Sequence, residues 1–285
     1  MLILLLAMLS SASMALVLKL FREPQGNRYG LLLGNYLTCI LIALLLMPDR
    51  SLILSGRPVT LVCGAVGGLL FVAGLVTMQS SVRLNGASLS AAFAKLGLLV
   101  SLILSLVCFG ERPGLVRILG VLLVIPALLL IHADRSGDSG KDSGARSFPL
   151  LLLTLLAGGS ADAMAKVFEQ LGDRAEDGLY FFWLFLTAAL FTALLALRER
   201  RRSGRHILPR ELAAGVAVGV PNYFSSYLLL RALEKLPAFL VYPVFSAGTI
   251  VLVTLLSALL FREKPGKLQR IGLLFILAAL VLLNL

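Results

Sequence analysis

Hydrophobic residues along this chain gather in long runs that are separated by short polar segments. Most runs have about the 17–25 residues that a helix needs to cross a bilayer, or come close to that length. We therefore predict an all-α integral membrane protein with ten transmembrane helices. The ten runs are Leu2–Leu20, Leu31–Met47, Val59–Met78, Ala87–Phe109, Leu115–Ile131, Leu150–Ala161, Phe181–Leu197, Leu212–Leu230, Phe239–Phe261 and Ile271–Leu285.

Composition supports the same class of protein and excludes several others. Of the 285 residues, 59% are hydrophobic and 14% are charged, and the mean hydropathy is +0.95. Too few polar residues remain to cover the surface of a soluble enzyme. The sequence has neither a metal-binding His/Cys cluster nor a phosphate-binding GxxxxGK[ST] loop. We expect no enzymatic activity, no cofactor, no metal and no nucleic-acid partner.

The chain divides into two halves that repeat each other. The polar segment 132–147 is rich in Gly and Ser and predicts a linker between a five-helix repeat at 1–131 and a second one at 148–285. Residues 5–17 resemble 155–167 at an offset of 150, and the turn FGERPG at 109–114 resembles FREKPG at 261–266 at an offset of 152. Because five spans is an odd number, the second repeat must cross the membrane in the opposite sense. Inverted repeats of this kind are typical of secondary transporters.

These features resemble the ten-helix EamA-type transporters of the drug/metabolite transporter superfamily. The resemblance rests on the two five-helix repeats and on the two turns, and it extends over nearly the whole chain. It implies export of a small metabolite through a central cavity that is lined by the first, third, fourth, sixth, eighth and ninth spans. The turns themselves carry no information about the substrate.

The cationic residues are distributed unevenly between the two sides of the predicted membrane. Loops 1–2, 3–4, 5–6, 7–8 and 9–10 hold 17 Lys and Arg residues, whereas the other side holds 7. Cation-rich loops remain in the cytoplasm in most membrane proteins. The charges therefore predict cytoplasmic placement of these loops in the cell membrane, with both termini outside. Members of the family that the chain resembles have both termini inside, so the two expectations differ.

Ionisable residues inside an apolar span are costly and usually face a cavity or a partner. Lys95 lies roughly 14 Å from the cation-rich side and Asp162 roughly 21 Å, at 1.5 Å per helical residue. A lysine stem can reach across the difference of about 7 Å. We predict that Lys95 binds an anionic group of the substrate and that Asp162 neutralises it in the empty state. Asp162 is also the candidate for proton coupling. The alternative is an ion pair that only locks the helices together.

Four further residues are candidates for substrate binding. Lys166 lies one turn beyond Asp162, and Gln79 lies in the third span. Asn222 follows Pro221 and Tyr242 precedes Pro243, and proline frees backbone carbonyls in spans that line cavities. The alternatives are that Lys166 snorkels outward from an ordinary solvated helix end, that Pro221 and Pro243 are tolerated kinks, and that Tyr242 belongs to an interfacial aromatic belt. Glu111 and Glu263 in the repeated turns are expected to lie beside helix N-termini rather than to act on substrate.

We interpret the sequence as a secondary active transporter that exports a small polar or anionic metabolite by alternating access. Its partners are the metabolite, the bilayer and a proton or counter-substrate, and it is a monomer or a homodimer. Two alternatives stay open: a lipid-linked-sugar flippase of the same fold, and a membrane scaffold or regulatory subunit that transports nothing. A scaffold would have a dry centre with a tightly packed Lys95–Asp162 pair.

The charge distribution generates a testable topology. A reporter fused after Leu285 should be active on the outer side of the membrane, because the arginine cluster at 198–210 resists translocation. A fusion in the 198–210 loop serves as the control and should report from the cytoplasm. The reverse pattern would show that the family topology overrides the charges.

Overall fold

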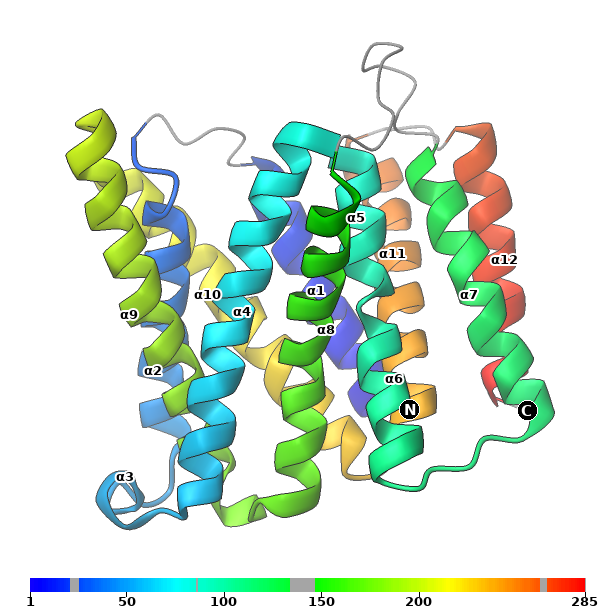
Figure 1. Ribbon diagram of the computed structural model, residues 1–285, viewed down its shortest axis with the longest axis horizontal. Coiled ribbons are helices and arrows are strands. Elements are labelled where there is room, and N and C mark those ends of the chain that lie inside the picture. Colours follow the sequence, from blue (N-terminus) through cyan, green and yellow to red (C-terminus); the bar gives the residue numbers. More distant parts are fainter. Residues whose placement is uncertain (21–25, 86, 134–146, 262–265, 285) are drawn as a thin grey trace. The chain divides into compact units, whose positions relative to one another are not determined.

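The structure is a computed structural model, and it describes residues 1–20, 26–85, 87–133, 147–261 and 266–284. Within these ranges the secondary structure is helical and includes no strand. Most of the predicted linker 132–147, and Glu263 with its turn, lie outside the described residues. The elements are α1 (Leu2–Leu20), α2 (Gly30–Leu46), α3 (Leu52–Ser55), α4 (Pro58–Asn85), α5 (Ala87–Leu96), α6 (Leu98–Cys108), α7 (Leu115–Ala133), α8 (Phe148–Leu171), the 3₁₀ turn η2 (Arg174–Glu176), α9 (Asp177–Ser203), α10 (Pro209–Leu233), α11 (Ala238–Phe261) and α12 (Lys267–Asn284) (Figure 1).

The helices follow the apolar runs of the sequence. Among the described residues, six helical segments are long and apolar enough to cross a membrane, and three shorter apolar helices accompany them at Leu2–Val17, Gly30–Leu46 and Leu115–Ile131. The last run of the sequence lies in α12. The chain is therefore an all-helical, multi-pass membrane protein, while the count of ten spans and the two-repeat organisation stay predictions.

One predicted span is divided. The run Ala87–Phe109 forms α5 and α6, which meet at Gly97. The amide of Gly97 donates to the Ala94 carbonyl at 3.2 Å, and the Val100 amide donates to the Gly97 carbonyl at 2.9 Å. Both bonds span three residues instead of four, which tightens the helix locally. Proline does not divide its helices in this way, since α10 and α11 continue through Pro221 and Pro243.

The described chain forms two compact units. The first unit contains Met1–Val72 and Val167–Arg231, and the second contains Ala73–Lys166 and Ala232–Leu285. Each unit therefore combines helices from both halves of the sequence. The division between the units falls inside α4 and α8, so these two helices contribute residues to both.

In the first unit, small residues let helices pack with their backbones close together. α2 packs against α9, and Gly34 of α2 faces the backbone of α10 at Leu212 and Gly215. Gly64 and Gly68 of α4 face the backbone of α9 in the same way. The GxxxG spacings of the sequence thus serve packing inside this unit.

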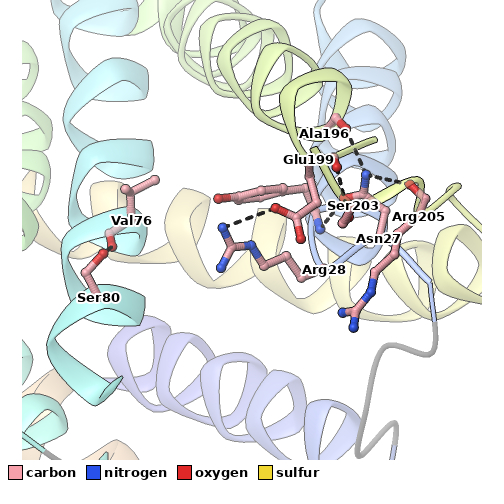
Figure 2. A network of polar contacts seen from close by, with 9 residues as sticks. Asn27, Arg28, Val76, Ser80, Ala196, Glu199, Ser203 and Arg205 are labelled. Atoms are coloured by element: carbon pink, nitrogen blue, oxygen red, sulfur yellow. Dashed lines mark hydrogen bonds and ion pairs between the residues drawn. The ribbon is translucent and has the colours of Figure 1, made fainter. Parts of the chain in front are cut away.

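A polar network fixes the cation-rich end of the first unit (Figure 2). The Asn27 side chain donates to the Ala196 carbonyl at 2.8 Å and to the Arg205 carbonyl at 3.4 Å. Arg28 forms an ion pair with Glu199 at 3.4 Å. These contacts bind the segment before α2 to the C-terminal end of α9, which is capped by Gly204 with a φ of 68°.

In the second unit, α7 and α12 lie side by side, and α11 packs against α6, α7 and α12 (Figure 1). Gly120 of α7 faces the Ala279 carbonyl of α12, and Gly272 of α12 faces the Ala127 carbonyl of α7. Ala127 also belongs to a buried apolar cluster with Ile131, Ala247 and Ile276.

Two adjacent glycines of α8 allow a matched test of this packing. A Cβ on Gly159 would collide with the Gly97 carbonyl, whereas a Cβ on Gly158 would have no atom within 4 Å. We expect Gly159→Ala to destabilise the protein by about 1–3 kcal/mol through overpacking. Gly158→Ala should stabilise it by up to about 1 kcal/mol, because alanine favours the helix. Thermal unfolding in detergent measures both variants, and equal effects would contradict the close contact of α8 with Gly97.

Candidate binding site

The candidate site lies in the second unit, where α5 and α8 each carry one charged residue. Lys95 is the last residue but one of α5, and Asp162 is in the middle of α8. The ammonium group and the carboxylate attract each other electrostatically. Asp162 is exposed although its neighbours Ala161 and Ala163 are buried, and Lys95 is partly buried. The Asp162 carboxylate is therefore accessible from one side, and Lys95 is close enough to attract it.

The backbones of α5 and α8 approach closely next to this pair. Gly97, two residues after Lys95, contacts Gly159, three residues before Asp162. The Ser101 hydroxyl donates to the Gly159 carbonyl at 3.1 Å. Only glycine lets two backbones come this near. This contact positions the two charged residues on facing helices.

Open space adjoins Asp162. Gly158 precedes Asp162 by four residues, so both lie on one face of α8. A Cβ added at Gly158 would meet no atom within 4 Å. The exposed carboxylate and the open space beside Gly158 therefore lie on the same face of α8.

Tyr242 of α11 connects to the same part of α8. Its hydroxyl donates to the backbone carbonyl of Asp162 at 2.8 Å, and the residue is 2% exposed. The contact holds the Asp162 backbone but leaves the carboxylate available. Of the residues singled out in the sequence, Lys95, Asp162 and Tyr242 thus lie together in the second unit.

Asn222 belongs to the first unit and has a different environment. Its side-chain amide donates to Asn35 Oδ1 at 3.1 Å, and the Cys39 thiol donates to the Gly219 carbonyl at 3.3 Å. Asn35, Cys39 and Asn222 are all buried. They form a polar contact between α2 and α10. Asn35 and Cys39 could not be singled out from the sequence, because single polar residues are common in spans.

Lys166 has a partner that the sequence did not reveal. Its ammonium group forms an ion pair with Glu111 at 3.2 Å and lies 6.0 Å from the centre of the Phe109 ring. Lys166 is 3% exposed. Glu111 lies between α6 and α7, but its carboxylate accepts hydrogen bonds from the amides of Ala238 at 3.0 Å and Phe239 at 3.2 Å. The turn therefore caps α11 and not the helix that follows it.

Gln79 lies in the portion of α4 that belongs to the second unit, where it is partly buried. The described residues include no group of three His, Cys, Asp or Glu side chains that could hold a metal ion. Cys39 and Cys63 are buried free thiols, and Cys108 is an exposed one.

These observations define a class of protein: a multi-pass α-helical membrane protein with paired charges inside its spans. Residues 149–285 match the EamA-like transporter family, and this part of the chain is an EamA-like transporter domain. The second half of the chain is thus similar to membrane transporters of the EamA-like family.

Two further comparisons extend over nearly the whole chain. A protein of Haemophilus influenzae described as "Uncharacterized protein" is 25% identical over 289 residues, which is 97% of this chain and 95% of the relative. A solved structure titled "Crystal structure of protein" has a TM-score of 0.75 at 17% identity, and the match covers 99% of this chain and 94% of that one. At this identity the second match shows that the fold is shared.

The capping role of Glu111 predicts a pH dependence. Burial raises the pKa of Glu111, but the hydrogen bonds from the Ala238 and Phe239 amides, the adjacent Ser105 hydroxyl and the charge of Lys166 outweigh it, so the pKa is lower than its usual 4.5. Glu111 therefore stabilises the fold fully above the unfolded-state pKa, and this stabilisation is lost as the pH falls through the lower folded-state pKa. Thermal unfolding of wild type and of Glu111→Gln is measured between neutral and strongly acidic pH. The difference between their unfolding temperatures should narrow below about pH 4.5. A constant difference would contradict the assignment.

Proposed function

We propose that the chain is a secondary active transporter that exports a small polar or anionic metabolite by alternating access. Lys95 binds the anionic group of the metabolite, and Asp162 neutralises Lys95 while the site is empty. The observation that carries the proposal is the accessible Lys95–Asp162 pair beside the open space at Gly158. An ion pair that only locked two helices would gain little over apolar packing and would have no need of an accessible carboxylate.

The repeat supports this assignment independently. At the offsets predicted from the sequence, Lys95 corresponds to Ala247 and Asp162 corresponds to Ala12. The repeated helices are therefore formed without these charges in the other half. A costly charge that the repeated helices do not require is best explained by a ligand that it binds.

The pair also suggests how binding couples to conformational change. A substrate anion that binds Lys95 releases Asp162, which then needs a proton or a cationic group of the substrate as its new partner. Each occupied or empty state has a different charge on α5 and α8, so each favours a different arrangement of these helices. Tyr242 keeps the Asp162 backbone in place through this exchange.

A ligand screen tests the role of Lys95. Purified protein is mixed with amino acids, sugars, nucleotides and phosphates, and the shift in unfolding temperature is measured. For any anionic ligand that stabilises the wild type, Lys95→Ala should weaken binding by roughly 10–100-fold, because a hydrogen bond to a charged group is lost. Lys235→Ala, at an exposed cation outside the site, is the control and should bind normally. An unchanged affinity of Lys95→Ala would contradict the proposal.

Transport of the same ligand tests the role of Asp162. In proteoliposomes with an imposed pH gradient, Asp162→Asn should abolish proton-driven accumulation but retain exchange of labelled for unlabelled ligand. Liposomes sorted by the orientation of the protein give the direction of net flux. If proton-driven flux of Asp162→Asn equals that of wild type, Asp162 has no part in coupling.

A further inference from the structure

We propose that the first turn of α11, Lys166 and Ser105 form an anion-binding subsite that Glu111 occupies in the present state. The carboxylate or phosphate of the departing metabolite takes the place of Glu111 there. This inference rests on the proposed function, since it assumes an anionic substrate that has first bound Lys95.

The contacts of Glu111 are those of a bound oxyanion. One carboxylate oxygen accepts from the Ala238 amide at 3.0 Å and from Lys166 at 3.2 Å, and the other accepts from the Phe239 amide at 3.2 Å. The first amides of a helix lack partners within the helix, and their dipoles favour negative charge. A substrate carboxylate or phosphate needs the same donors.

A buried hydroxyl adds a donor that Glu111 leaves unused. Ser105 is fully buried next to the Glu111 carboxylate, yet among the described residues its hydroxyl has no partner at hydrogen-bonding geometry. An unsatisfied buried hydroxyl is costly, so it suggests a ligand in another state of the protein. The guanidinium group of Arg117 lies 5.5 Å from the Phe239 ring centre and adds positive charge near the same turn.

Capping alone does not account for Lys166. Glu176 in the first unit caps α4 by accepting from the Arg57 amide and from the Thr60 hydroxyl. The contacts described for Glu176 include no lysine. In the predicted repeat, Lys166 corresponds to Leu16, so the repeated helix forms without the charge. Neither the capping of α11 nor the predicted repeat requires the buried charge of Lys166. This charge is therefore consistent with a site that binds anions.

The position of Lys166 places this subsite next to the first one. Asp162 and Lys166 are one turn apart on the same face of α8, yet Asp162 is exposed and Lys166 is 3% exposed. Within one turn, α8 therefore passes from an exposed position to a buried one. An anion that replaces Glu111 would release the turn between α6 and α7 from the first turn of α11.

Chemical rescue tests the subsite without knowledge of the substrate. Glu111→Ala removes the internal carboxylate and leaves its donors in place, so its unfolding temperature should fall by several degrees. Sodium acetate, compared with sodium chloride at equal concentration, should restore at least half of that loss. The variant Glu111→Ala with Lys166→Met should show no specific effect of acetate, and neither should wild type.

The capping carboxylate of the first unit supplies the matched control. Glu176→Ala loses an equivalent cap but has no lysine in its place, so acetate should stabilise it no more than chloride does. Equal acetate effects in all four proteins would overturn the proposal. If Glu111→Ala is not obtained in folded form, the shorter Glu111→Ser replaces it, since serine also leaves the place of the carboxylate empty beside Lys166. Because rescue requires no transport, failure here is distinguishable from failure of the Lys95 and Asp162 experiments.

Discussion

The cost of a charge inside hydrocarbon is the constraint on which the functional part of this molecule depends. Lys95, Asp162 and Lys166 are placed in apolar spans, where a charge is costly. Each must have a counter-charge or a route to water. Asp162 is the counter-charge of Lys95, and Glu111 is the counter-charge of Lys166. Both pairs include a residue of α8, where Asp162 and Lys166 are one turn apart.

Close backbone packing makes these pairs possible. A lysine and a carboxylate on separate helices can attract each other only when the helices approach, and the Gly97–Gly159 contact provides that approach for α5 and α8. The same contact coincides with the tightened turn that separates α5 from α6. Lys95 thus sits at the end of a helix rather than in the middle of one, where a small change in the turn would move its ammonium group relative to Asp162.

The sequence predicts much of this arrangement, for physical reasons that also set its limits. Long apolar runs give the helices because the bilayer requires them, and single charges at matching depth indicate Lys95 and Asp162 as a site. The break at Gly97 was not foreseen, because a lone glycine in an apolar run carries no sign of the helix that will pack against it. The pairing of Asn222 with Asn35 was missed for a similar reason, since 187 residues separate them.

The role of Glu111 was only half recognised. Its turn indicated a helix N-terminus, but the helix it caps begins 127 residues later.

That last contact has a consequence for how the two halves of the chain depend on each other. The turn at 109–114 is the most specific feature of the predicted repeat, and in the structure its glutamate binds a helix of the opposite half. The second unit is accordingly built from helices of both halves, with Glu111 as one of the contacts between them. A motif that joined only neighbouring helices would stabilise each half alone. A motif that caps a helix of the other half couples them, so Lys166 can influence α11 and the turn between α6 and α7 through one carboxylate. Such coupling supports the proposed alternating access between the predicted repeats.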